Sequence, residues 1–233
     1  MSRFINSFKN DIKIQFKYGF YTVYLIVTVI YIIILKSIPE EFVSKTLTFI
    51  IFSDPSFLGF LFIGAIILFE KSENTIDFLT ATPLRIHEYI LSKVFSLSFL
   101  SFIASLVIIF AVVGIKFNFL ILLIAIILTS SFFTLLGIFA VSKMNNINEY
   151  LIWTMLYLSI FSIPVISFFE IFNSSLFYLF PTHSSLNLFS MLFSETSSIK
   201  AIISIFILII FNLLMYYFTY KRFYKYVILK AGG

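Results

Sequence analysis

Few residues in this chain could perform catalysis. It contains 2 His and no Cys, so thiolate metal sites and disulfides are excluded. His87 and His183 fall on opposite sides of the membrane in the topology derived below, so they cannot form a metal or base cluster together. We therefore expect no metal site and no catalytic site.

A phosphate-binding loop is also missing from the sequence. Such a loop needs Gly-x-x-x-x-Gly-Lys followed by Ser or Thr, because backbone amides hold the phosphates and the Lys reaches the terminal ones. Gly59 and Gly64 have the outer spacing, but Ala65 and Ile66 follow them inside an apolar run. We expect no cofactor bound by this chain, so energy from ATP must come from a partner.

Two acidic residues lie within apolar runs. Asp54 precedes Pro55, and Glu170 follows Pro164. An ionisable side chain deep in a bilayer costs roughly 2.5 to 3.5 kcal/mol, so it normally faces a cavity, a partner or the interface. Each residue is therefore a candidate for a substrate pathway. The alternative is hydration near the outer surface, which is favoured for Glu170 and left open for Asp54.

The composition indicates that a bilayer is the solvent of this protein. Of its 233 residues, 61% are hydrophobic, only 12% are charged, and 33 are Phe. The formal charge of +5 could suggest nucleic acid. That interpretation needs a clustered basic face on a folded domain, whereas these cations lie beside apolar spans. We expect no nucleic-acid partner.

Six apolar runs are each long enough to cross the roughly 30 Å hydrocarbon core as a helix. They cover residues 18–38, 47–69, 93–113, 118–141, 151–172 and 199–219. The sequence therefore predicts an all-α membrane protein, with one six-helix transmembrane domain over 18–219 and a tail over 220–233.

The basic residues orient this bundle. Twelve of the 16 Lys and Arg residues fall on the side of the N-terminus. The other four are Lys36, Lys45, Lys116 and Lys200. Because cytoplasmic loops are enriched in Lys and Arg, we expect a multi-pass protein of the cell membrane with both termini in the cytoplasm.

Residues 1–17 carry two stripes that repeat every four residues. The apolar stripe is Phe4, Phe8, Ile12 and Phe16, and the basic stripe is Lys9, Lys13 and Lys17. On a helix these stripes are adjacent, which is typical of an amphipathic segment lying in the inner headgroup layer with its cations on anionic lipid. The alternative is an ordinary solvated helix.

The stretch from Glu70 to Lys93 concentrates the charge of the chain. Its carboxylates include Glu73 and Glu88. Asn74 followed by Asp77 predicts the start of a short helix that carries Ile76 and Leu79 on one face. Pro83 must end that helix, and Thr82 can cap a following helix whose first residue is Pro83.

At this point the sequence resembles the permease subunits of type-2 ABC exporters. The resemblance covers the layout of the whole chain and a degenerate motif in this stretch. The matching residues are Glu70, Thr75, Ile76, Asp77, Leu79, Thr82, Pro83, Glu88, Tyr89, Ile90 and Lys93. The resemblance implies that the stretch is a cytoplasmic coupling helix that docks on a separate ATP-binding cassette subunit, which holds ATP and Mg. It also implies a second copy of this or a related permease.

The segment between the fifth and sixth spans, 173–198, is outside the membrane in this topology yet contains two short apolar stretches. They flank Pro181 and His183, and each is too short to span. We expect short outer re-entrant helices. In the resembled family such helices form an outer gate, which makes Phe177, Phe180 and His183 pathway candidates; an interfacial loop packed on lipid is the alternative.

Two other classes of function compete with an exporter of amphipathic drugs or peptides. An intramembrane protease is weakly suggested by Glu40, Glu41 and Lys45, but Arg is expected where Lys45 stands and these residues fall in an outer loop. A non-transporting immunity or sensor protein is the stronger alternative. ATP-dependent efflux would separate the exporter from it.

Overall fold

The computed structural model describes residues 2–76, 84–193 and 198–229, and within them every regular element is helical. Five units are long and apolar enough to cross a membrane. They are α2 (Phe20–Ser37), the unit of α3, η1 and α4 (Glu40–Ser72), α6 (Ile86–Val112), α7 (Phe119–Val141), and the unit of α11 and η3 (Ile199–Ile228). The chain is a multi-pass membrane protein, as its composition predicts.

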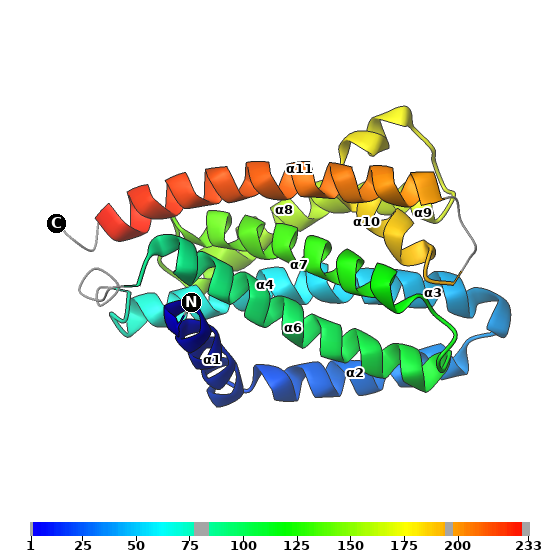
Figure 1. The fold of residues 1–233 in the computed structure, drawn as a ribbon, viewed down its shortest axis with the longest axis horizontal. Coiled ribbons are helices and arrows are strands. Elements are labelled where there is room, and N and C mark those ends of the chain that lie inside the picture. Colours follow the sequence, from blue (N-terminus) through cyan, green and yellow to red (C-terminus); the bar gives the residue numbers. More distant parts are fainter. Residues whose placement is uncertain (1, 77–83, 194–197, 230–233) are drawn as a thin grey trace.

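Helix α7 occupies the centre of the bundle, with α6 on one side and α11 (Ser198–Phe223) on the other (Figure 1). Two side chains of α11 donate hydrogen bonds to backbone carbonyls of α7. Asn212 bonds to the carbonyl of Leu128 at 3.0 Å, and Thr219 bonds to that of Leu135 at 2.9 Å. These bonds fix the register of the two helices, since side-chain partners in a membrane interior are few.

The second span is longer than the predicted run of 47–69 and is interrupted near its middle. It consists of α3 (Glu40–Ser53), the π-helical turn η1 (Asp54–Leu58) and α4 (Gly59–Ser72). Pro55 lies in η1 and has no N–H to donate, so the regular ladder of hydrogen bonds cannot continue there. The apolar pattern located the span but missed its polar first turns.

The predicted fifth span, 151–172, is divided in the structure. Helix α8 (Ile147–Ser162) has 16 residues, and the single turn α9 (Val165–Phe168) follows Pro164. The 16 residues of α8 fall short of a full span, because crossing the hydrocarbon core takes about 20. That residues 151–172 cross the membrane, in addition to the five units above, therefore stays a prediction.

At the described ends of the connection from the second span to the third, the capping residues differ from the predicted ones, whereas the predicted helix carrying Asp77 and Leu79 lies outside the described residues. Asn74 has a φ of 53°, so it lies just beyond the end of α4 and does not start a helix. Helix α6 begins at Ile86 and not at Pro83, and Glu88 accepts a hydrogen bond of 2.9 Å from the backbone N–H of Arg85. This capping interaction satisfies a backbone donor that the first turn leaves unpaired.

Two short helices follow α9, namely the 3₁₀-helix η2 (Ser175–Leu179) and α10 (Pro181–Ser190). Helix α10 packs against α3, α7 and α11, and Thr129 of α7 donates a 3.0 Å hydrogen bond to Ser185. Short helices are therefore present where the sequence expects them, and their depth in the bilayer stays a prediction.

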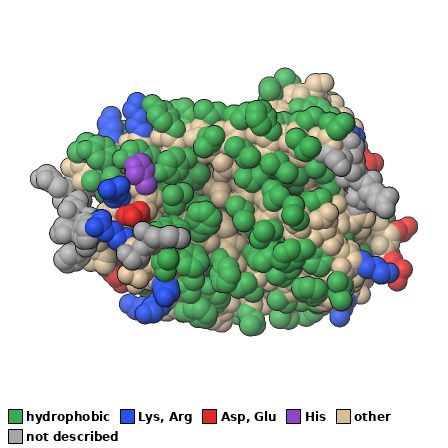
Figure 2. Space-filling view, in the orientation of Figure 1, with side chains coloured by type: hydrophobic (Ala, Val, Ile, Leu, Met, Phe, Trp, Pro, Cys, Tyr) green, Lys and Arg blue, Asp and Glu red, His purple; other side chains and the backbone are tan. Residues whose placement is uncertain are grey.

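The charged side chains gather toward the two ends of the molecule, and apolar side chains cover the middle (Figure 2). Large apolar residues such as Leu25, Phe110 and Leu213 are exposed on the outer faces of the long helices, as expected of a surface that contacts lipid. Helix α1 (Ser2–Lys17), the last turns of α11, the end of α4 and the start of α6 lie at one end of the bundle, on the left of Figure 1. The α2–α3 and α6–α7 turns lie at the other.

Candidate functional site

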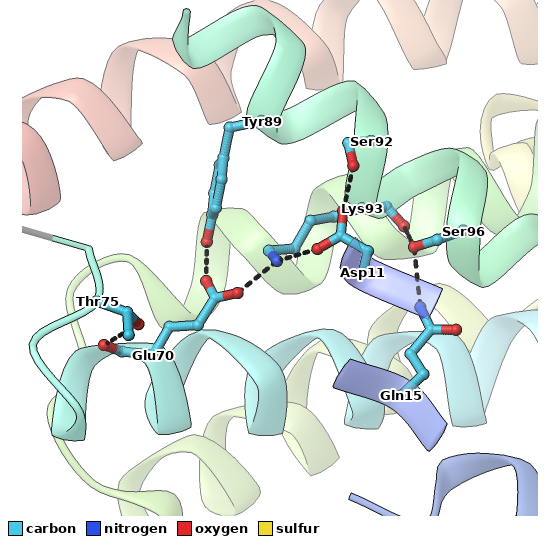
Figure 3. Close-up of polar contacts among 8 residues, drawn as sticks. All are labelled: Asp11, Gln15, Glu70, Thr75, Tyr89, Ser92, Lys93 and Ser96. Carbon is cyan, nitrogen blue, oxygen red and sulfur yellow. Dashed lines mark hydrogen bonds and ion pairs between the residues drawn. The ribbon is translucent and has the colours of Figure 1, made fainter. Parts of the chain in front are cut away.

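Lys93 is the centre of a buried ionic cluster at the end of the bundle that holds the α4–α6 connection. Its ammonium nitrogen lies 2.7 Å from a carboxylate oxygen of Asp11 and 2.6 Å from one of Glu70 (Figure 3). The side chain is only 2% exposed. Two carboxylates therefore replace the water that an exposed ammonium would bind.

Neighbouring groups complete this cluster. The Tyr89 hydroxyl donates to the other oxygen of Glu70, and the Ser92 hydroxyl donates to Asp11. We call these five residues, Asp11, Glu70, Tyr89, Ser92 and Lys93, the Lys93 cluster. Each carboxylate thus receives a hydroxyl hydrogen bond besides the ion pair, which is the arrangement that makes buried charges tolerable.

Three helices, α1, α4 and α6, supply the side chains of the cluster. Glu70 lies in the last turn of α4, and Lys93 lies in the second turn of α6. Asp11 comes from the middle of α1 (Ser2–Lys17). One turn further on, Gln15 donates a 2.8 Å hydrogen bond to Ser96, so α1 meets α6 through two polar pairs at matching intervals of four residues. The cluster therefore fastens α1 to both helices that enter the α4–α6 connection.

A cavity of about 200 Å³ adjoins the cluster. It is lined by residues on both sides of segment 77–83, including Thr75, Ile76 and Leu84, and by Glu73. The Tyr18 hydroxyl donates to Glu73 at 2.6 Å, and this bond to a carboxylate, with smaller help from burial, raises the pKa of the Tyr18 phenol. The turn between α1 and α2 is thereby tied to the end of α4.

A second anchor holds the end of α4 against the far end of α7. The ammonium of Lys71 donates to three backbone carbonyls, those of Val141 at 2.9 Å, Ser142 at 3.1 Å and Met144 at 2.7 Å. A cation at the C-terminus of a helix is favourable because the last carbonyls point there unpaired. The consecutive residues Glu70 and Lys71 of α4 thus bind different helices. Glu70 contacts α6, and Lys71 contacts the end of α7.

These contacts make a junction between α1 and the ends of α4, α6 and α7. Among the residues that the structure describes, no group of three His, Cys, Asp or Glu side chains could hold a metal ion. His87 stacks on Tyr220 with ring centroids 4.5 Å apart at the same end as the Lys93 cluster, whereas His183 lies on α10 near the opposite end. The arrangement suits the transmission of movement between helices.

Comparison with known proteins gives this junction a context. A profile of the fluoroquinolones export permease protein family matches residues 2–231. The chain belongs to this family. It is also 24% identical over 198 residues to fluoroquinolones export permease proteins from two strains of Mycobacterium tuberculosis, and the match covers 84% of each chain. The predicted resemblance to an exporter permease is therefore confirmed.

In this export permease, the residues predicted for coupling divide into two groups. Glu70 belongs to the Lys93 cluster and Glu73 binds Tyr18, while Thr75 donates a 2.9 Å hydrogen bond to the backbone carbonyl of Glu70. Ile76 is buried, and Glu88 caps α6. Asp77, Leu79 and Pro83 lie outside the described residues, as does Thr82. The described members of the set stabilise the two ends of the connection.

The candidate pathway residues of the permease do not form one site. Asp54 is buried in η1, with neither carboxylate oxygen hydrogen-bonded within the described residues. Glu170 is exposed and pairs with Lys45 at 2.8 Å, and this hydrogen bond and charge lower the pKa of its carboxyl group. The interpretation of Glu170 as a hydrated outer residue fits this environment.

Three further pathway candidates belong to the outer segment of the permease. Phe177 is buried and Phe180 is partly buried with its ring against Phe161. His183 is half-buried beside Tyr178, and burial lowers the pKa of its imidazole. All three pack within the outer segment or against α8, and the structure brings none of them to the Lys93 cluster.

The N-terminal helix of the permease shows why some site residues escaped sequence analysis. The three cations of the basic stripe, Lys9, Lys13 and Lys17, are exposed, and Phe4 and Phe8 pack on Phe95 and Phe99 of α6. Asp11 and Gln15 belong to neither stripe, and both bind α6. Their spacing of four residues, matched by Ser92 and Ser96 on α6, was the available signal.

Proposed function

We propose that this permease is the membrane subunit of an ATP-driven exporter and forms the translocation pathway for an amphipathic, drug-like substrate. Fluoroquinolones are the first substrate class to test, because the relatives that match most of the chain are named for their export. A separate ATP-binding cassette subunit binds ATP and Mg and supplies the energy, and a second copy of this or a related permease completes the transporter.

The Lys93 cluster is the observation that carries the coupling part of this proposal. It ties α1, α4 and α6 together at the two ends of the α4–α6 connection. A connection held at both ends by buried ion pairs passes a push on to the helices, whereas a loosely held loop absorbs it. The partner subunit therefore docks on the stretch from Glu70 to Lys93.

The orientation follows from the same arrangement. The α4–α6 connection, both chain ends and most Lys and Arg residues face the cytoplasm, where the partner finds ATP. Lys9, Lys13 and Lys17 are exposed along α1 and contact anionic lipid headgroups of the cell membrane. The outer segment with Phe177, Phe180 and His183 caps the pathway on the opposite side.

Copurification followed by transport tests this function. The tagged chain is purified from its native membrane, its soluble partner is identified by mass, and the complex is reconstituted in proteoliposomes. We expect a fluorescent fluoroquinolone to accumulate inside vesicles in which the partner faces outward, only with ATP and Mg, and vanadate to stop it. Binding of the drug without ATP-dependent accumulation would instead support a sensor or immunity protein.

The coupling assignment is tested in the same vesicles with the double variant Asp77→Ala and Leu79→Lys. We expect this variant to insert normally and to lose drug-stimulated ATP hydrolysis and transport. Lys13→Met, which removes an exposed cation of α1, is the matched control and should keep most of both activities. Unchanged drug-stimulated hydrolysis in the double variant would contradict docking at this connection.

A further inference from the structure

Asp54 is an ionisable residue with an unusual environment in the interior of the bundle. It is 1% exposed, and neither of its carboxylate oxygens has a hydrogen-bond partner within the described residues. An ionised carboxylate in such a place would carry a cost that only a counter-ion or several hydrogen bonds could offset. The side chain is therefore either protonated or bound to a cation.

The charged groups of the surrounding helices are too far away to act as that counter-ion. The turn η1 packs against α3, α4, α6 and α7, and α7 contains no ionisable residue. Glu70 and Lys71 on α4 lie 16 or more residues beyond Asp54, which is about 24 Å along a helix. The ionisable residues of α6 are His87, Glu88, Tyr89 and Lys93, all in its first eight positions and therefore beside Glu70.

The remaining neighbours are equally unable to neutralise Asp54. On α3, Glu40, Glu41 and Lys45 lie toward the outer end, and Lys45 is paired with Glu170. Helix α2 carries Tyr24 and Tyr31 near Asp54, and its Lys36 is exposed at the end of the helix. The Tyr24 hydroxyl is hydrogen-bonded to Ser101 at 2.9 Å. Among the described residues, the ionisable groups near Asp54 are thus phenols, which are neutral at pH 7.

Buried hydroxyl groups also occur on α6 and α7, two of the helices that pack on η1. Ser98 and Ser105 of α6, and Ser130 and Thr134 of α7, have buried oxygens without a hydrogen-bond partner within the described residues. Hydroxyl groups can serve as donors or acceptors for a polar guest. A π-helical turn is itself frequent at functional sites, because it displaces backbone groups from the regular ladder.

We propose that Asp54 binds the protonated amine of the transported substrate, and that the amine displaces the proton held by the carboxyl group when the site is empty. This inference rests on the proposed function and specifies its substrates as amphipathic molecules with a basic nitrogen. Fluoroquinolones with a free piperazine nitrogen belong to this class. In the exchange, the O–H bond of the carboxyl group breaks, one proton leaves to water, and the ammonium group takes its place as counter-ion, so charge is conserved.

The test compares two probes that differ in one charge. They are a fluorescent fluoroquinolone with a free piperazine nitrogen and its N-acetyl derivative, which is uncharged at that nitrogen. Binding is measured with the purified complex by fluorescence and, in weakly buffered solution, by proton release. We expect the wild type to release about one proton per amine bound and none with the N-acetyl probe.

Variants at one position provide the controls. Asp54→Asn should weaken amine binding about 30-fold or more, abolish proton release and leave binding of the N-acetyl probe unchanged, which shows that the bundle is folded. Asp54→Glu should restore part of the amine preference. Glu41→Gln, which neutralises an exposed carboxylate at the outer end of α3, should behave as the wild type.

Two results of the binding measurements would overturn the inference. One is equal affinity of the wild type and Asp54→Asn for the amine probe, and the other is amine binding without release of a proton. Failure of the proposed function is distinguishable, because in that case the wild-type vesicles accumulate neither probe with ATP. A wild type that transports both probes equally well keeps the export function but removes the role of Asp54.

Discussion

At the scale of single residues, Lys93 shows how this protein uses charge inside an apolar molecule. Its ammonium group is removed from water and bound by Asp11 and Glu70, which come from different helices. The net gain from forming such a buried trio is small, because desolvation offsets most of the attraction. The cost of breaking it is large, since a charge then stays buried without a partner. Lys93 therefore contributes more to the placement of α1 and α4 than to overall stability.

The first prediction concerns Lys93→Met, which leaves both carboxylates buried without their cation. We expect a destabilisation of about 3 to 5 kcal/mol, seen as a lower melting temperature of the purified protein in detergent. The triple variant Asp11→Asn, Glu70→Gln and Lys93→Met removes all three charges and should recover much of the loss. Lys13→Met should change the melting temperature little, and an equally large fall in that control would contradict the role given to Lys93.

Some of these residues could be predicted from the local sequence and others could not. The family motif pointed to Glu70 and Lys93, and the rarity of charge within an apolar run pointed to Asp54. Neither signal pointed to Asp11, because a partner 82 residues away in the chain cannot be deduced from the local pattern of one helix. The local sequence could not show that Asp54 has no hydrogen-bond partner among the described residues, since this depends on the side chains of the surrounding helices.

At the scale of elements, two glycines let three helices approach closely. Tyr150, near the start of α8, is fully buried, and its hydroxyl donates to the backbone carbonyl of Phe60 in α4. A Cβ atom at Gly64 would lie 2.0 Å from the Tyr150 ring, and one at Gly137 of α7 would lie 2.4 Å from Ile63. Small residues at helix contacts are the usual means of close packing in membranes. Gly64, which stands at the spacing of a phosphate-binding loop from Gly59, thus allows close packing of helices.

The second prediction compares Gly64→Ala with Gly59→Ala. The first substitution forces a methyl group into the Tyr150 ring and should cost roughly 1 to 3 kcal/mol or more from overpacking. The second should be tolerated, because the nearest atom to its Cβ is the Thr134 hydroxyl oxygen at 3.8 Å. Melting temperatures in detergent measure both. The double variant Gly64→Ala and Tyr150→Leu should regain stability, and a failure to do so would show that the ring is not the obstacle.

Element boundaries were predictable where an apolar run coincides with a helix. The run 118–141 lies between Lys116 and Lys143 and agrees closely with α7 (Phe119–Val141). The second span was predicted too short, because α3 begins with Glu40 and Glu41, whose charges lower the hydropathy there. The fifth run was predicted as continuous, although Pro164 breaks it, since an averaged apolar signal does not register a single break.

At the scale of the whole molecule, the two ends differ in what they hold. One end has the Lys93 cluster, the Lys71 anchor and the exposed cations of α1. At the other end, the ion pair found among the described residues joins the exposed side chains of Lys45 and Glu170. An ion pair between exposed side chains contributes little stability. Separating the helices at the first end would leave buried charges without partners, whereas separating Lys45 from Glu170 would leave both charges hydrated.

The third prediction is the topology of the chain, tested by cysteine labelling in intact cells. The chain has no Cys, so single substitutions give no background. Asn10→Cys, Lys143→Cys and Lys225→Cys should be protected from a membrane-impermeant maleimide, and Lys116→Cys and Asn173→Cys should react. All five positions are exposed in the folded chain.

The outcome also decides whether α8 and α9 together cross the membrane. Labelling of positions 143 and 173 from the same side would exclude a sixth crossing. The reverse pattern at all five positions would place the α4–α6 connection outside the cell, where no partner could hydrolyse ATP, and would remove the basis of the proposed function.

The contact of Lys71 with the carbonyls of Val141, Ser142 and Met144 has a mechanical consequence. Those carbonyls stand at the turn from which α8 departs, so the last turn of α4 and the first turn of α8 share one anchor point. Glu70, the residue before Lys71, binds Lys93 of α6. A displacement of the last turn of α4 is therefore transmitted through two consecutive side chains, to α6 on one side and to the turn before α8 on the other.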